Sequence, residues 1–166
     1  MKRLPMRALV LGLFVILPCI NFAQDTDKQS LIDIEQEYAS SAPLPPGAPT
    51  PAQKYMYDGP LMQLSAAGAV HATSKSDILS GRGRGRGGNP ADPAVKRETH
   101  RADFHVEIYG DTGLIGYTQS VTETGHQDAS LNKTSYSACL DTFVKRDGKW
   151  YGISNACSPS KPPAGN

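Results

Sequence analysis

The chain has 166 residues, of which 39% are hydrophobic and 20% are charged, and 17 Lys and Arg residues nearly balance 16 Asp and Glu residues. A formal charge of +1 gives no global reason to expect a nucleic-acid or membrane partner, because such partners select strongly basic chains. The length suits one ordinary domain with a single hydrophobic core.

The first 23 residues have the pattern of a secretory signal peptide. Three basic residues precede an apolar run over residues 8–20, and Ala23 stands at a plausible cleavage point. A run of about a dozen apolar residues is shorter than the ~20 that a transmembrane helix needs. We therefore expect an exported protein, periplasmic or secreted, without a membrane partner after cleavage. The alternative is a lipoprotein anchored at Cys19, although Pro18 stands where a small residue is expected.

The remaining chain is expected to form one domain over residues 24–160. It contains a proline-rich connector at residues 43–51 and an Arg-Gly loop at residues 81–94, which we expect to be flexible and solvated. Residues 161–166 are expected to form a disordered tail. Cleavage after Ala23 would leave 14 Lys and Arg against 16 Asp and Glu, a formal charge of about −2.

Two helices are predicted in the first part of this domain. Thr26 and Gln29 form a capping-box pattern, and apolar residues through Tyr38 follow at helical spacing. A second capping pattern begins at Thr50, with Pro51 in the first helical position, which suits proline because the amide there needs no partner. This short helix is expected to stop before Gly59.

Short strands are then expected at residues 61–64 and 69–72, followed by a single helical turn that Ser74 caps. A half-buried strand follows, because Phe104, Val106 and Ile108 alternate with polar residues. His105 is out of phase with them and should point away from the core. After a Gly-Asp turn, residues 114–123 are expected to form another strand.

The last third of the chain predicts a long antiparallel hairpin over residues 134–159. Asp147-Gly148 separates two runs rich in β-branched and aromatic residues, and this dipeptide tolerates the positive φ of a tight primed turn. Cys139 and Cys157 lie on the two arms, one residue out of register, so a disulfide needs one β-bulge or a strand end. Such a bridge would stabilise the fold by roughly 3 kcal/mol. The alternative is two buried free thiols.

Helices followed by a run of long strands predict an α+β fold, a cone-shaped curved antiparallel sheet covered on its concave face by the N-terminal helices. The chain also resembles the SnoaL-like, nuclear transport factor 2-like (cystatin-like) superfamily, and within it the DUF4440-type branch. The resemblance rests on residues 26–38 and 61–79, on VEIYGDTGLIGY at residues 106–117 and on DTFVKRDGKW at residues 141–150. The C-terminal half is also similar to the association domain of calcium/calmodulin-dependent kinases.

This resemblance implies a pocket between the helices and the concave sheet face, without implying an activity. The pocket arginines of the association domain correspond to Gln119 and Asp141 here. Since neither position holds arginine, a neutral or cationic ligand is expected rather than a carboxylate.

Asp141 and His71 are the candidate catalytic residues. A buried carboxylate resists ionisation, so Asp141 could act as a general base, and His71 lies near the pocket mouth that the resemblance implies. The alternatives are an Asp141 carboxylate held by a backbone group or a tyrosine, and a His71 exposed at a strand end.

The expected ligand-binding residues are Tyr38, Tyr117, Gln119, Tyr136 and Asn155. The tyrosine hydroxyls could stabilise a substrate oxygen, or the rings could simply belong to the core.

The sequence contains no combination of residues that predicts a metal or cofactor site. We favour an exported module that binds a small molecule without catalysis and forms a homodimer through the sheet face that carries Tyr109. The second hypothesis is a cofactor-independent isomerase or lyase, for instance a dehydratase, that acts on a small apolar substrate. The third, nucleic-acid binding through Arg82, Arg84 and Arg86, is the weakest, because three arginines without interleaved aromatic residues make a small electrostatic footprint.

Overall fold

The structure, a computed structural model, describes residues 17–64, 69–80 and 95–162. Three α-helices precede and interrupt the strands: α1 (Leu17–Ala39), α2 (Pro51–Tyr55) and α3 (Lys75–Leu79). Two short strands, β1 (Leu61–Leu64) and β2 (Val70–Thr73), are followed by four long ones: β3 (Lys96–Tyr109), β4 (Thr112–Thr124), β5 (Lys133–Arg146) and β6 (Lys149–Pro159). A 3-10 helix, Ala129–Leu131, lies between β4 and β5.

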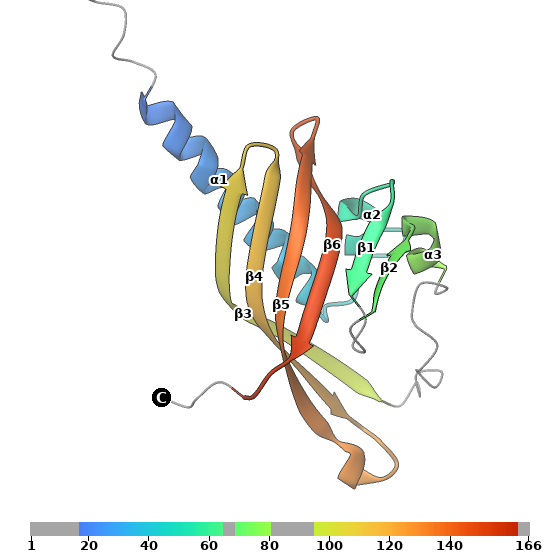
Figure 1. Cartoon of the computed structure of the whole chain (residues 1–166). Helices are drawn as coiled ribbons and strands as arrows, with labels where there is room; N and C mark the ends of the chain where they lie inside the picture. Colours follow the sequence, from blue (N-terminus) through green and yellow to red (C-terminus); the bar gives the residue numbers. More distant parts are fainter. Residues whose placement is uncertain (1–16, 65–68, 81–94, 163–166) are drawn as a thin grey trace, which may run out of the picture.

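The strands form one six-stranded sheet in the order β2-β1-β6-β5-β4-β3. Its strands curve around α1, which crosses one face (Figure 1). The α+β fold predicted from the sequence is confirmed, but the expectation of a purely antiparallel sheet is wrong. β1 pairs with β6 in parallel, while all other neighbouring strands are antiparallel. The long chain segment between β1 and β6 allows β1 to join the free edge of β6 in the same direction.

The hydrophobic core lies between α1 and the concave face of the sheet. Leu31 and Ile34 of α1 pack with Ile115, Phe143 and Trp150 of the long strands. This packing stabilises the helix more than its intrinsic propensity does, because an amphipathic helix gains most from burying its apolar face.

An ion pair also joins α1 to the β5–β6 hairpin. Lys145 Nζ lies 2.6 Å from Asp27 Oδ1, and the indole Nε1 of Trp150 donates to the same oxygen at 3.1 Å. Helix α1 is thus held to the β5–β6 hairpin by both apolar and polar contacts.

Helix α1 begins earlier than the capping pattern predicts. The helix runs through Thr26, whose carbonyl accepts a hydrogen bond from the Ser30 side chain, instead of starting there. Pro18 suits a first turn, and no residue from 19 to 25 is a glycine or proline that would stop the helix.

The two predicted caps further along the chain are confirmed. Thr50 and Gln53 form a complete capping box at the start of α2. The Ser74 side chain accepts from the Asp77 amide at 3.1 Å and caps α3. The turn around Ala67-Gly68 lies outside the described residues.

The long hairpin is confirmed together with its disulfide. Asp147 and Gly148 have φ angles of 51° and 75°, as a primed turn between β5 and β6 requires. The register shifts between Thr142 and Phe143, and this bulge brings Cys139 directly opposite Cys157. The two cysteines form a disulfide with a Cα–Cα distance of 4.1 Å. The bulge supplies the one-residue correction that the sequence required.

Strand β3 is longer than predicted, because it begins at Lys96 rather than just before Phe104. Its register shifts between Ala102 and His105, where Asp103 has a φ of 54°. His105 is exposed, as its position in the alternation predicted.

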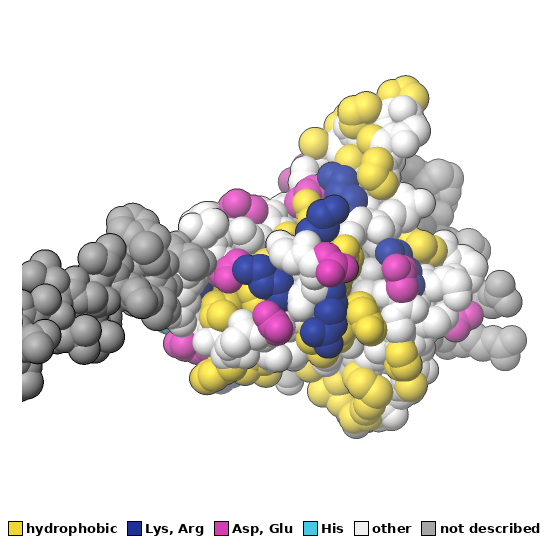
Figure 2. Space-filling view, turned by 90° about the horizontal axis from the view of Figure 1, so that it is seen from above, with side chains coloured by type: hydrophobic (Ala, Val, Ile, Leu, Met, Phe, Trp, Pro, Cys, Tyr) yellow, Lys and Arg dark blue, Asp and Glu magenta, His cyan; other side chains and the backbone are white. Residues whose placement is uncertain are grey.

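Basic and acidic side chains are interspersed among hydrophobic ones at the end of the molecule that carries the β3–β4 and β5–β6 turns (Figure 2). Within residues 17–64, 69–80 and 95–162, no helix has the length and apolar character that crossing a membrane requires. The Arg-Gly loop, with Arg82, Arg84 and Arg86, lies outside the described residues, as do residues 1–16 of the expected signal peptide.

Candidate functional site

The inner face of the sheet carries a group of polar side chains beside the core. Gln119 of β4 lies opposite Arg101 of β3, and Asp141 of β5 lies opposite Asn155 of β6. Arg101 and Phe104 would face opposite sides of a regular strand. The bulge between them lets both side chains face α1, because it adds one residue to the alternation.

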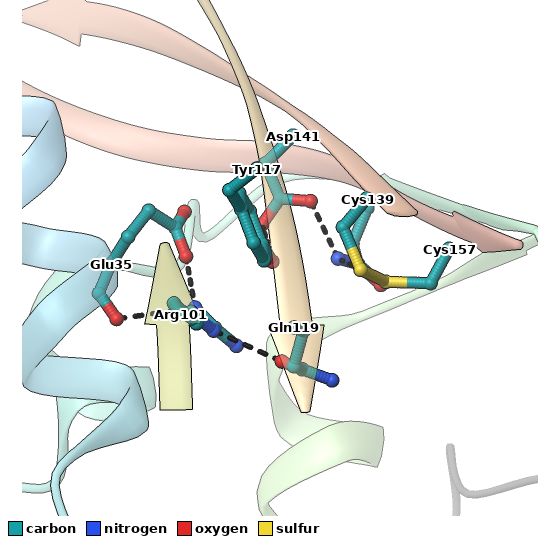
Figure 3. A network of polar contacts seen from close by, with 8 residues as sticks. Glu35, Arg101, Tyr117, Gln119, Cys139, Asp141 and Cys157 are labelled. Carbon is teal, nitrogen blue, oxygen red and sulfur yellow. Dashed lines mark hydrogen bonds and ion pairs between the residues drawn. A yellow bond between two sulfur atoms is a disulfide. The ribbon is translucent and has the colours of Figure 1, made fainter. Parts of the chain in front are cut away.

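Arg101 is the centre of this group. Its Nη1 donates to the carboxylate of Glu35 on α1, with which it forms an ion pair, and to the Glu35 carbonyl at 3.3 Å. Its Nε donates to Gln119 Oε1 at 3.0 Å. The guanidinium lies 4.8 Å from the ring centre of Tyr117 and 5.9 Å from that of Tyr38. Figure 3 shows Arg101 between Glu35 and Gln119.

Asp141 lies next to this ion pair and is only 9% exposed. Its Oδ1 accepts from Asn155 Nδ2 at 2.5 Å, and its Oδ2 accepts from the Tyr117 hydroxyl at 3.2 Å. Asn155 Nδ2 also lies 3.7 Å from the Cys157 sulfur, so the disulfide adjoins the site (Figure 3).

Burial changes the acidity of both carboxyl groups. It raises the pKa of Glu35 from 4.5 to about 8, with a further increase from the Asp141 charge that Arg101 only partly offsets. Burial also raises the pKa of Asp141, although the hydrogen bond from Asn155 opposes the increase. One Glu35 oxygen, Oε1, is buried without a hydrogen-bond partner among the described residues. One guanidinium thus faces two carboxyl groups with raised pKa values, which favours the retention of a proton in this cluster.

An open cavity of about 210 Å³ lies beside the cluster. Its polar lining includes Tyr38, Arg101, Asp141 and Asn155. Its other lining residues, most of them apolar, come from the C-cap of α2 and from α3, β1, β5 and β6: Met56, Leu61, Met62, Gln63, Ile78, Phe143, Gly152, Ile153 and Ser154. The polar residues therefore occupy one part of a mainly apolar wall, an arrangement typical of small-molecule sites.

The structure brings together most of the residues that the sequence singled out. Asp141, Tyr38 and Asn155 line the cavity, whereas Tyr117 and Gln119 hydrogen-bond to residues that line it. The Tyr117 hydroxyl donates to the buried Asp141 carboxylate. Asp141 is therefore held by a tyrosine, which the sequence analysis gave as the alternative to a general base.

Two predicted residues lie elsewhere. Tyr136 lines a separate groove of about 380 Å³, together with His100 and Asp103. His71 is exposed on the edge strand β2, where it pairs with Gln63, and it is not among the residues that line the cavity.

Sequence reasoning missed Glu35 and Arg101, which form the buried ion pair. Glu35 follows Leu31 by four residues and precedes Tyr38 by three, so a charged residue at an apolar helical position was the available signal. Arg101 was missed because β3 was expected to begin later. The expectation of a neutral or cationic ligand was based on the lack of arginine at positions 119 and 141, but Arg101 reaches the pocket from the strand beside Gln119.

The part of the chain that the structure describes has no group of three or more His, Cys, Asp or Glu residues placed to hold a metal ion.

Comparison with solved structures identifies the fold as that of nuclear transport factor 2-like proteins. An NTF2-like superfamily protein from Salmonella enterica matches with a TM-score of 0.61 and 15% identity, covering 84% of this chain and 95% of that one. An NTF2-like protein of unknown function from Prochlorococcus has a TM-score of 0.55 and 11% identity, covering 81% of this chain and 94% of that one.

A hexachlorocyclohexane dehydrochlorinase also shares the fold, with a TM-score of 0.61 and 9% identity over 88% of this chain and 95% of that one. No protein-family profile matches the chain, and no curated protein matches its sequence. At these identities the comparisons establish the fold alone.

Proposed function

We propose that this chain is an exported, SnoaL-like protein of the DUF4440 type that binds a small, mostly apolar molecule in the cavity beside Asp141. The observation that carries the proposal is the combination of an open apolar cavity with a buried charged cluster in its wall. Burying a guanidinium and two carboxyl groups costs free energy, and a core of apolar residues would serve stability equally well. A polar cluster placed beside a cavity is therefore best explained by recognition of a ligand.

The size of the cavity limits the ligand. A volume of about 210 Å³ suits a small molecule. The apolar walls favour a hydrocarbon body, and the cluster favours a single polar end.

The binding proposal is tested with a variant that fills the cavity. Ile78 lines the cavity from α3, whereas the next residue, Leu79, is 45% exposed and does not line it. A set of small cyclic compounds is screened by ligand-observed NMR against the wild type, Ile78→Trp and Leu79→Trp. We expect the compounds that bind the wild type to bind Leu79→Trp equally and to lose binding to Ile78→Trp. Equal binding to both variants would contradict the proposed site.

A second candidate function is cofactor-independent acid–base catalysis, as in an isomerase or lyase. It is favoured by a specific observation: Asp141 lines the cavity with a raised pKa, as a carboxyl group that moves protons near neutral pH requires. The dehydrochlorinase of the same fold makes such chemistry a reasonable comparison. Turnover lost in Asp141→Asn would support this candidate, and the His71→Ala variant tests whether His71 takes part. An activity unchanged in both would remove these assignments.

We further propose a homodimer through the outer face of the sheet. Leu140, Ala156, Leu64 and Val70 lie in register across four neighbouring strands, and three of them are 39–63% exposed. Such a continuous apolar row, together with the exposed Tyr109, needs cover, and a second copy of the same face provides a matching surface.

Export is proposed from the first 23 residues, and the disulfide is compatible with it because disulfides persist in oxidising compartments. Expression of the full chain followed by N-terminal sequencing of the product in the periplasm or medium tests it. A product that retains Met1 in the cytoplasm would contradict export, and a lipid-modified Cys19 would support the lipoprotein alternative.

A further inference from the structure

We infer that the cavity recognises a neutral molecule through a carbonyl oxygen, which accepts hydrogen bonds from Arg101 and Tyr38. This inference rests on the proposed binding function and adds the chemical class of the ligand. It follows from the hydrogen-bonding capacity of the side chains in the cavity wall and from the charges beside them.

The first step concerns the donors that the protein leaves unused. A guanidinium has five N–H groups, and those of Arg101 reach Gln119 from Nε and Glu35 from Nη1. Within the described residues, the Nη2 group of Arg101 has no hydrogen-bond partner, and neither has the hydroxyl of Tyr38. Both residues line the cavity, and the guanidinium lies 5.9 Å from the centre of the Tyr38 ring. A ligand atom at this place therefore meets donors.

The carboxylate in the same wall is already engaged. Oδ1 of Asp141 accepts from Asn155, and Oδ2 accepts from Tyr117. Glu35 is completely buried and directs one oxygen toward Arg101. An ammonium group, which only donates, would thus face the Arg101 charge and two unused donors, so a primary amine fits poorly.

The charge of the cluster decides which ligand group, a carboxylate or a carbonyl, is the better acceptor. One cation, Arg101, already faces the two carboxyl groups of Glu35 and Asp141, as Figure 3 shows. A ligand carboxylate would add a third acidic group at a buried site, which is unfavourable unless both protein carboxyl groups take up protons. A carbonyl oxygen satisfies the same donors without adding charge. Among oxygen acceptors, the neutral carbonyl therefore fits best.

The test uses four probes that share a six-membered ring and differ in their polar group: cyclohexanone, cyclohexanecarboxylate, cyclohexylamine and unsubstituted cyclohexane. Affinities for the full, oxidised protein are measured at pH 7 by titration with protein-observed NMR. We expect cyclohexanone to bind about tenfold more tightly than the amine, which cannot accept from these donors, and than the carboxylate, which adds a third acidic group.

The matched variants are Tyr38→Phe and Tyr55→Phe. The Tyr55 hydroxyl donates to Glu37 at 2.7 Å, and Tyr55 does not line the cavity. Tyr38→Phe should weaken cyclohexanone binding by about three- to tenfold and leave cyclohexane unchanged, whereas Tyr55→Phe should change neither.

The outcomes separate this inference from the binding proposal. If the amine or the carboxylate binds most tightly at the cavity, or if Tyr38→Phe binds cyclohexanone like the wild type, the carbonyl inference is overturned while the cavity remains a binding site. If no probe, including cyclohexane, shifts resonances of cavity residues at millimolar concentration and Ile78→Trp gives the same spectra with the probes as without them, both proposals fail.

Discussion

Each face of the sheet carries side chains that stability alone would not favour: buried charges on the inner face and exposed apolar residues on the outer face. On the inner face, Arg101 and Asp141 lie beside the core, where Arg101 pairs with Glu35 of α1. The outer face exposes Leu140 and Leu64 in one row. Single exposed leucines are ordinary, but buried charges and an aligned apolar row both need an explanation. We propose that the inner face binds the ligand and that the outer face binds a second copy of the chain.

The largest expected effect is on the inner face, from Arg101→Met. The substitution leaves two buried carboxyl groups without a cation, so we expect the free energy of unfolding to fall by about 3–5 kcal/mol at pH 7. Urea denaturation followed by circular dichroism measures the change.

The matched control is Arg97→Met on the same strand, β3. Arg97 also forms an ion pair, with Glu123 at 2.7 Å, but its side chain is 61% exposed. We expect a loss below about 1 kcal/mol, because exposed ion pairs contribute little. Equal losses in the two variants would mean that Arg101 has no special role in the buried cluster.

The next effect concerns the disulfide, which joins β5 and β6 beside Asn155. Replacing both Cys139 and Cys157 by Ala should lower the free energy of unfolding by about 3 kcal/mol, as expected for a closed loop of 18 residues. A reductant should bring the wild type to the same stability and leave the double variant unchanged. A wild type that is insensitive to reductant, with two titratable thiols in the native protein, would show that the bridge does not form.

Glu35→Gln tests whether the inner face holds a proton. The pKa of Glu35 is raised from 4.5 to about 8 by burial, so the folded state keeps a proton that the unfolded chain has lost. Stability of the wild type should therefore fall as pH rises from 4.5 to about 8, by at most about 1.4 kcal/mol per pH unit. The variant, which cannot ionise at this position, should show a shallower decline.

Glu37→Gln is the control on the same helix. Hydrogen bonds from Lys54 and Tyr55 lower the pKa of Glu37, so its contribution to stability is present above its ordinary pKa of 4.5 and is lost as pH falls. The two variants should thus change the pH dependence in opposite directions. Parallel stability profiles for the wild type and Glu35→Gln would contradict the raised pKa.

The sequence predicted the parts of the fold that depend on residues close together in the chain. Local signals predicted the elements well: Thr50 and Ser74 as caps, Asp147-Gly148 as a turn, and Cys139 with Cys157 as a bridge that requires a bulge. Each depends on residues close together in the chain or in one hairpin. The parallel pairing of β1 with β6 depends on contacts distant in sequence, and no local pattern indicated it.

The candidate site was predicted only in part, again because some of its contacts join residues that are distant in sequence. Asp141 was identified by its correspondence to a pocket position, and the structure places it in the cavity wall. Arg101 needs the bulge at Asp103 to face α1, and Glu35 needs Arg101 to be tolerated in the core. An ion pair between residues 66 positions apart leaves no pattern that joins its two members, because the helical spacing marks Glu35 alone.

The smallest effect on stability is expected on the outer face, from Leu140→Lys. Leu140 is 50% exposed, so the monomer should lose no more than about 0.5 kcal/mol in free energy of unfolding.

The same change places a charge in the middle of the apolar row that includes Leu64 and Ala156. If two copies meet through this face, the wild type should be a dimer by light scattering and Leu140→Lys a monomer of nearly unchanged monomer stability. Leu131→Lys, at a leucine of similar exposure (55%) in the 3-10 helix between β4 and β5, measures the effect of an added charge outside the row. A monomeric wild type, or a dimer that Leu140→Lys leaves intact, would mean that the exposed leucines serve another partner or none, and that the inner face alone carries the function.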